Sequence, residues 1–247
     1  MSLPGIGPVS FLGRARRQPR PPVPHTARQR ALTHMATSVL LAYPGEEAVA
    51  KYPTIAAELG GLPRPIADRL GAFLTHAEHV GPDGLAQEYV ATFDLKRKCS
   101  LYLSYFLTGD TRKRGTALVT FLEVYRAAGF EFDAAELPDF LPVVLEFSAV
   151  GDAELAGVLL ASHREGLEVL REALAALGSP WTGVVEAVTL TLPHVDEATR
   201  RRTLDLIAGG PPAEMVGADA LGPGEPLVAA ATGSHLPLIP SPARPQE

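Results

Sequence analysis

The chain has 247 residues, of which 46% are hydrophobic and 6% aromatic, and its formal net charge is −6. This composition suits one folded domain with a core built mainly from Leu, Val and Ala, and the acidic balance argues against nucleic-acid binding, which needs a basic face. The single cysteine, Cys99, excludes an internal disulfide and a structural zinc site, and it fits the reducing cytoplasm.

Apolar periodicity, interrupted by proline and glycine, predicts helices throughout the middle of the chain. In chain order we expect them at residues 27–42, 46–59, 64–80, 85–93, 100–107, 114–128, 138–150, 152–177, 180–192 and 196–207. Gly81-Pro82-Asp83-Gly84 predicts a turn between the third and the fourth helix. We find no strand alternation and no repeat of fixed period. The predicted fold class is therefore all-α, a single-domain helical bundle with short connections.

The predicted helix at 114–128 has the clearest pattern, because Leu118, Phe121, Leu122 and Tyr125 recur at helical spacing. Gly129 is placed to cap its end. The longest periodic segment is 152–177, whose apolar stripe we expect to face the core.

Both ends of the chain are rich in proline. Fourteen of the 23 prolines lie outside residues 25–208, and such segments cannot bury a core. We predict a disordered N-terminal tail over 1–26, a helical domain over 27–208 and a disordered C-terminal tail over 209–247. The second tail contains a short apolar piece, Leu236 to Ile239, as a possible docking segment.

Targeting and membrane signals are missing from the sequence. No run of about 18 apolar residues is present, so no membrane span is predicted. Arg14, Arg16, Arg17 and Arg20 are followed by prolines instead of the apolar stretch of a signal peptide. We expect a cytoplasmic protein without direct membrane insertion.

The charge is unevenly distributed along the chain. Residues 1–30 carry six Arg and no acid, whereas residues 31–208 carry 15 basic and 24 acidic side chains. Acidic character of this kind favours a basic partner, or it serves solubility alone.

Enzymatic motifs are also missing. No phosphate-binding glycine loop and no nucleophile elbow is present. Cys99 follows Lys96-Arg97-Lys98, which would lower the pKa of its thiol, but no histidine is placed to act as its base. His76 and His79 share a helix face, yet a metal site needs three or four ligands, so we expect a surface pair. The sequence predicts no catalysis, no bound metal and no cofactor.

Polar and aromatic residues gather in one block between residues 87 and 147. Tyr89 and Phe93 are four residues apart on one predicted helix, and Leu101 and Tyr105 on the next. The simpler interpretation of each aromatic ring is that it packs in the hydrophobic core. Tyrosines also suit a wet groove that binds a peptide, and acids around such a groove favour a basic, apolar peptide helix.

At this block the chain resembles the NarJ group of nitrate reductase molybdenum cofactor assembly chaperones, relatives of the TorD and DmsD chaperones. The resemblance rests on Tyr89-x-x-x-Phe93-Asp94, on Ser100-Leu101-Tyr102-Leu103 with Gly109-Asp110-Thr111-Arg112 and Glu123-x-Tyr125, and on Glu136-Leu137-Pro138-Asp139 with Leu145-Glu146-Phe147. The helical region 31–208 resembles the family in length and order, and the tails do not.

The resemblance implies an all-α chaperone that binds the apo catalytic subunit of respiratory nitrate reductase through a basic, apolar N-terminal segment. It would support molybdenum cofactor insertion and leave before membrane attachment. The residues expected to line the peptide groove are Tyr89, Phe93, Leu103, Tyr105 and Tyr125. The acids expected to pair with basic residues of the peptide are Glu88, Asp94, Asp110, Glu123, Asp139 and Glu146.

Alternatives remain for the acids and for the whole protein. In the first alternative, Asp110 or Asp94 forms an ion pair within the protein, with Arg112 or Arg114. In the second, Asp110 and Asp139 cap helices. The protein-level alternatives are a chaperone for another molybdoenzyme, a permanent helical subunit of such a complex, and a nucleotide-dependent enzyme. The segment Glu136 to Asp139 favours the nitrate reductase type.

Overall fold

A computed structural model of the chain describes residues 21–108, 112–132, 136–192 and 238–240. The structure is almost entirely helical, so the predicted all-α class is confirmed. Its helices are α1 (Ala27–Leu41), α2 (Glu46–Val49), α3 (Tyr52–Glu58), α4 (Arg64–Tyr89), α5 (Leu103–Thr108), α6 (Arg112–Ala127), α7 (Leu141–Val150), α8 (Ala153–Ser162), α9 (Arg164–Ala176) and α10 (Trp181–Thr189). Asp110 and the predicted helix at 196–207 lie outside the described residues.

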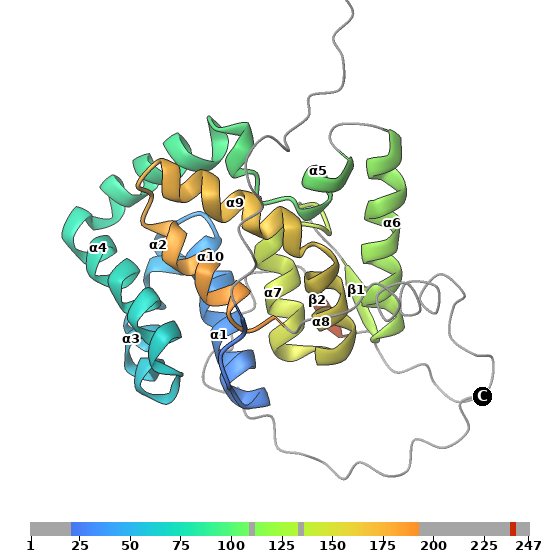
Figure 1. Ribbon diagram of the computed structural model, residues 1–247, viewed down its shortest axis with the longest axis horizontal. Helices are drawn as coiled ribbons and strands as arrows, with labels where there is room; N and C mark the ends of the chain where they lie inside the picture. Colours follow the sequence, from blue (N-terminus) through green and yellow to red (C-terminus); the bar gives the residue numbers. More distant parts are fainter. Residues whose placement is uncertain (1–20, 109–111, 133–135, 193–237, 241–247) are drawn as a thin grey trace, which may run out of the picture.

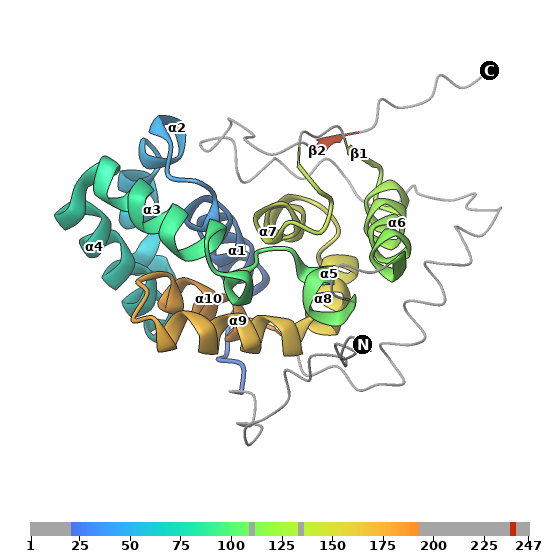
Figure 2. The same cartoon turned by 90° about the horizontal axis from the view of Figure 1, so that it is seen from above.

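The centre of the molecule is formed by α1, α7 and α10, which are far apart in the sequence. Helices α2 to α4 lie at one end of this centre and α6 at the other, as two perpendicular views agree (Figure 1, Figure 2). Residues 141–148 of α7 are all buried, and α7 packs mainly against α1 and α8. The indole of Trp181 is buried and donates a 2.9 Å hydrogen bond to the Leu40 carbonyl, which joins α10 to α1.

A buried polar cluster crosses the same centre. The His34 ring is 2.7 Å from Ser148 Oγ and 2.7 Å from Thr191 Oγ1. Ser38 Oγ donates a 2.8 Å bond to the Pro142 carbonyl. These contacts satisfy the polar groups that α1 buries, which would otherwise destabilise the fold.

The predicted turn at 81–84 is a kink within α4. Gly81 has φ +72°, a conformation that glycine adopts without strain, and Pro82 follows it. The kink brings His76 and Glu88 together, with 2.7 Å between Nε2 and Oε2. The expected surface histidine is thus held by a carboxylate across the bend.

Several boundaries differ from the sequence-based expectation. The segment 46–59 is divided into α2 and α3, and 152–177 is divided at His163. His163 leaves the helical conformation with φ −103° and ψ 12°, and its ring lies 2.8 Å from the Leu159 carbonyl. The helix expected from Pro138 begins only at Leu141, with Pro142 in its first turn.

The expectation of no strands is wrong in one place. Strand β1 (Phe130–Phe132) pairs antiparallel with β2 (Leu238–Pro240), with Glu131 opposite Ile239. Gly129, with φ +78°, ends α6 as expected and turns the chain into β1. The apolar piece near the C-terminus therefore has a docking place on the helical body.

Candidate functional site

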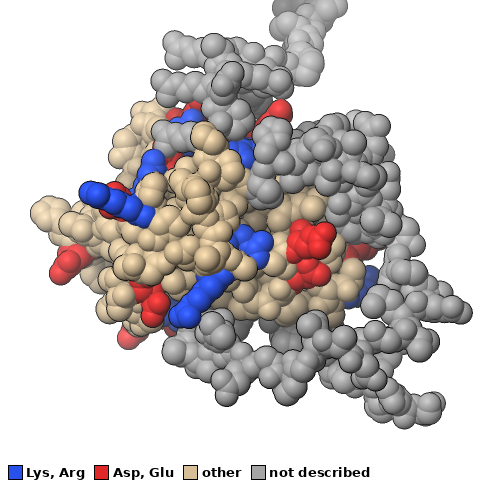
Figure 3. Space-filling view, turned by 60° about the horizontal axis from the view of Figure 1, so that its bottom comes forward, with Lys and Arg blue, Asp and Glu red and all other residues tan. Residues whose placement is uncertain are grey.

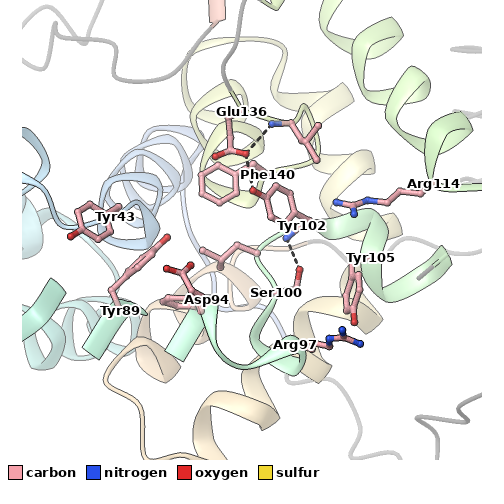
Figure 4. Close-up of a pocket in the computed structure, with 13 residues that line it drawn as sticks. Tyr43, Tyr89, Asp94, Arg97, Ser100, Tyr102, Tyr105, Arg114, Glu136 and Phe140 are labelled. Atoms are coloured by element: carbon pink, nitrogen blue, oxygen red, sulfur yellow. Dashed lines mark hydrogen bonds between the residues drawn. The ribbon is translucent and has the colours of Figure 1, made fainter. Parts of the chain in front are cut away.

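A cleft of about 590 Å3 opens where the C-terminal end of α4 approaches the segments around 100–106 and 136–140 (Figure 4). We call it the aromatic cleft. Its lining residues are Tyr43, Tyr89, Phe93, Asp94, Arg97, Ser100, Leu101, Tyr102, Tyr105, Arg114, Glu136, Leu137 and Phe140.

One wall is formed by a π-helical turn, Val90–Asp94, that continues α4. Its wider backbone closes with a 3.2 Å bond from the Leu95 N–H to the Val90 carbonyl. Phe93 is thereby half-buried, with its ring 4.7 Å from Tyr89 and 5.3 Å from Trp181. The aromatic contacts continue outward from Tyr89 to the exposed Tyr43 at 5.5 Å, so apolar surface extends from the core to the solvent.

The opposite wall is a short pairing of two extended segments. Tyr102 and Phe140 form an isolated antiparallel bridge, with backbone bonds of 3.0 Å from Leu103 to Asp139 and 2.8 Å from Leu141 to Leu101. This pairing explains why α5 begins at Leu103, although the sequence predicted a helix from residue 100.

Tyr102 is fixed on this wall by polar contacts. Its hydroxyl donates a 2.7 Å hydrogen bond to Glu136 Oε1. Burial raises the pKa of Tyr102 above the usual tyrosine value, and the Glu136 carboxylate raises it further. The Arg114 guanidinium lies 5.4 Å from the centre of the Tyr102 ring. Tyr102 therefore remains a neutral hydrogen-bond donor.

Asp139 lies behind this wall and is fully buried. Its Oδ2 accepts bonds of 3.1 Å from the Ser104 N–H and 2.6 Å from Ser104 Oγ. These donors are at the N-terminus of α5, so Asp139 caps that helix from a distant part of the chain, and the capping alternative is confirmed for Asp139.

The charges in the aromatic cleft are balanced, with Asp94 and Glu136 against Arg97 and Arg114. Acids do flank the cleft, as the sequence suggested, but two arginines accompany them. Figure 3 shows acidic and basic side chains interspersed over one face of the molecule.

A second hollow of about 420 Å3 lies between α4 and the start of α10. It is lined by Asp68, Arg69, Ala72, Phe73, His76, Gly178, Pro180 and Gly183. Arg69 Nε is 2.8 Å from Glu186 Oε2, and His76 is paired with Glu88. The Arg69 guanidinium and the His76 ring are thus engaged within the fold.

Residues 59–186 match the sequence profile of the nitrate reductase delta subunit. The chain belongs to the nitrate reductase delta subunit family. The matched residues include the whole of the aromatic cleft except Tyr43.

Three relatives illustrate the range of the family. The nitrate reductase-like protein NarX of Mycobacterium tuberculosis is 38% identical over 154 residues, which are 62% of this chain and 23% of that protein. The probable nitrate reductase molybdenum cofactor assembly chaperone NarJ of Bacillus subtilis is 31% identical over 169 residues, 67% of this chain and 91% of that protein. The nitrate reductase molybdenum cofactor assembly chaperone NarJ of Escherichia coli K12 is 34% identical over 118 residues, which are 48% of this chain and 47% of that protein. This chain thus spans about a quarter of NarX.

Four of the residues predicted from the sequence do line the aromatic cleft of this delta subunit family member: Tyr89, Phe93, Asp94 and Tyr105. Asp94 has no ion-pair partner among the described side chains, so the alternative pairing with Arg114 is not observed, and the side chain of Arg112 lies outside the described part of the chain.

The other predicted residues that the structure describes do not line the cleft. Leu103, Tyr125, Asp139 and Glu146 are buried, and the Tyr125 hydroxyl donates a 2.6 Å bond to the Pro138 carbonyl. Burial, followed by the nearby Asp139, raises the pKa of Tyr125. Glu88 is paired with His76, and Glu123 on α6 does not line the cleft.

Several cleft residues were not predicted as site residues. Tyr102, Glu136 and Phe140 lie within the polar and aromatic block. The sequence predicted helices over 100–107 and 138–150, whereas the structure places Tyr102 and Phe140 in extended segments before α5 and α7. Tyr43 follows the first predicted helix, which ends at residue 42, and no sequence pattern placed its ring in the site.

Other potential sites give no support for catalysis. Cys99 is buried, and burial raises the pKa of its thiol despite the opposing effect of Lys96. The expectation of a lowered thiol pKa is therefore wrong. Among the described residues, no group of three or more His, Cys, Asp or Glu is arranged to hold a metal ion. In the same part of the chain, no helix has the length and apolar character needed to cross a membrane.

Proposed function

We propose that this protein is an assembly chaperone for a respiratory nitrate reductase. It binds the immature catalytic subunit at the aromatic cleft, through a basic and apolar N-terminal segment, and supports molybdenum cofactor insertion before membrane attachment. Membership of the delta subunit family and the similarity to the two NarJ assembly chaperones support this role. The cleft itself, open and lined by six aromatic rings, is the observation that carries the proposal.

The cleft suits a peptide because its rings combine apolar faces with polar tips. Tyr43 is 54% exposed and Tyr105 is partly exposed, so binding would remove their apolar surface from water. A volume of about 590 Å3 accommodates a few side chains of a peptide. Asp94 and Glu136 supply carboxylates for its basic residues.

The chaperone acts by differential affinity. It binds the segment while the catalytic subunit is immature and loses these contacts when the mature subunit orders the same segment elsewhere. A difference of about 1.4 kcal/mol between the two states changes the affinity tenfold. No bond is made or broken, and the protein needs no cofactor of its own. We expect this cycle to take place in the cytoplasm.

The proposal is tested by calorimetric titration of the full chain with a synthetic peptide from the N-terminus of the partner catalytic subunit. We expect submicromolar to micromolar binding that weakens when the peptide's basic residues are changed to Ala. Tyr43→Ala should weaken binding roughly tenfold, the effect of losing one well-placed aromatic contact. Leu177→Ala is the matched control, because Leu177 is 50% exposed and does not line the cleft.

Failure of the folded wild-type protein to bind this peptide would contradict the proposal. Tighter binding of an N-terminal peptide from a different molybdoenzyme would instead identify another client. Stable co-purification with the mature, cofactor-loaded enzyme would indicate a permanent subunit.

A further inference from the structure

Two opposite charges in the aromatic cleft have no ion-pair partner among the described residues. Asp94 and Arg97 are both exposed and both line the cleft. Glu136 differs because it accepts bonds from the Tyr102 hydroxyl and the Leu137 N–H, at 2.7 and 3.1 Å. Arg114 lies over the Tyr102 ring. Asp94 and Arg97 are therefore the charges most available to a ligand.

The backbone separates these two side chains although they are only three residues apart. Asp94 is the last residue of the π-helical turn, and Arg97 begins a 3-10 turn, Arg97–Cys99. Between them Lys96 is extended, with φ −118° and ψ 98°. Figure 4 shows the result, with Asp94 lying toward Tyr89 and Tyr43 and Arg97 lying beside Tyr105.

Each charge is accompanied by aromatic surface. Asp94 follows Phe93, whose ring contacts Tyr89, and Tyr89 in turn contacts Tyr43. At the other end, Tyr105 packs edge-on against Phe106, with 5.8 Å between ring centres. A guanidinium beside an aromatic ring is well suited to a carboxylate, which it binds through two parallel hydrogen bonds.

We propose that the aromatic cleft binds a segment that carries both charges: a basic residue at the Asp94 end and a carboxylate at the Arg97 end. This inference rests on the proposed function and specifies its ligand. An entirely basic segment would place like charge against Arg97, which disfavours binding. The two charges thereby fix the direction in which the segment lies, and they select against basic, apolar segments that lack an acid.

The experiment uses the full chain and the N-terminal peptide of the catalytic subunit in two further forms. In one form every acidic residue is changed to its amide, and in the other every basic residue is changed to Gln. Each peptide is titrated into the wild type, Arg97→Gln and Asp94→Asn. Lys98→Gln and Glu78→Gln are matched controls, since both residues are exposed and neither lines the cleft.

We expect Arg97→Gln to weaken binding of the native peptide three- to tenfold and to leave binding of the acid-free peptide unchanged. Asp94→Asn should show the same pattern with the base-free peptide, and the controls should match the wild type. Unchanged or tighter binding of the native peptide by Arg97→Gln would overturn the inference while leaving the proposed function intact. Absence of binding by the folded wild type would overturn both. Circular dichroism melts of each variant verify that it folds.

Discussion

The aromatic cleft and the second hollow are both open depressions next to α4, yet they differ in what their charges do. In the second hollow Arg69 is 2.8 Å from Glu186, and His76 is 2.7 Å from Glu88. In the aromatic cleft Asp94 and Arg97 have no such partner among the described residues. A depression whose charges are already paired stabilises the fold, whereas one with unpaired charges and exposed rings favours a ligand.

The largest expected effect comes from breaking the ion pairs beside the second hollow. Glu186 contacts Arg69 at 2.8 Å and Arg171 at 3.7 Å, and the Arg171 side chain is only 8% exposed. Glu186→Gln removes the carboxylate from Arg69, while Arg171 keeps Glu168 at 2.8 Å. We expect the free energy of unfolding to fall by roughly 2 to 3 kcal/mol.

Urea denaturation measures this loss. Glu78→Gln, on the exposed face of α4, is the control and should change stability by less than about 0.5 kcal/mol. Equal stability of the two variants would mean that the charges beside the second hollow are no more important than surface charges.

The second largest effect is a dependence of stability on pH that arises in the core. Burial, followed by the nearby charges of Arg30 and His25, lowers the pKa of His34 from 6.5 to about 3. Below pH 6.5 the His34 imidazole is therefore protonated in the unfolded chain but stays neutral in the folded chain. The free energy of unfolding consequently falls as the pH decreases from 6.5 toward 3. The loss should reach about 2 kcal/mol at pH 5.

The measurement is urea denaturation between pH 7.5 and 5. The control is His34→Gln, which has no imidazole and should show a flatter dependence over this range, even if it is less stable throughout. Identical slopes for the two proteins would assign the acid sensitivity to other groups.

A smaller effect is expected at the wall of the aromatic cleft. Tyr102→Phe removes the 2.7 Å hydrogen bond to Glu136 but keeps the ring under Arg114. We expect a loss of about 1 kcal/mol in stability, or about 2–4 °C in Tm. Thermal denaturation checks this, and an unchanged Tm would show that water replaces the hydroxyl without cost.

The smallest expected effect distinguishes the two depressions directly. Ala72 is exposed and lines the second hollow, so Ala72→Trp fills that hollow without entering the core. We expect the affinity for the catalytic-subunit peptide to remain unchanged in calorimetric titration. Weaker binding by this variant would mean that the second hollow, too, takes part in binding.

The helices were predictable from the sequence because their signals are local. Residues at helical spacing and breaks such as Gly81-Pro82 report on neighbours a few positions away. The pairing of Tyr102 with Phe140 and of β1 with β2 depends on segments far apart in the sequence, which no local pattern encodes.

The candidate site was predicted only in part for the same reason. Tyr89 and Phe93 were identified because they are four residues apart on one helix. Glu88 was included as a neighbour of Tyr89, but adjacent residues point about 100° apart on a helix, and Glu88 meets His76 instead. Tyr43 reaches the cleft from the loop after α1, and only the folded chain reveals that contact.

The packing of α1 against α7 has a consequence for how the protein is made. Ser38 on α1 bonds to the Pro142 carbonyl, 104 residues further along the chain. A ribosome that adds about 5–20 residues per second needs roughly 5–20 s to produce that partner. During this interval the apolar face of α1, including Leu40 and Leu41, has no α7 to cover it. A protein proposed to bind an immature partner thus passes, during its own synthesis, through an interval in which the apolar face of α1 is uncovered.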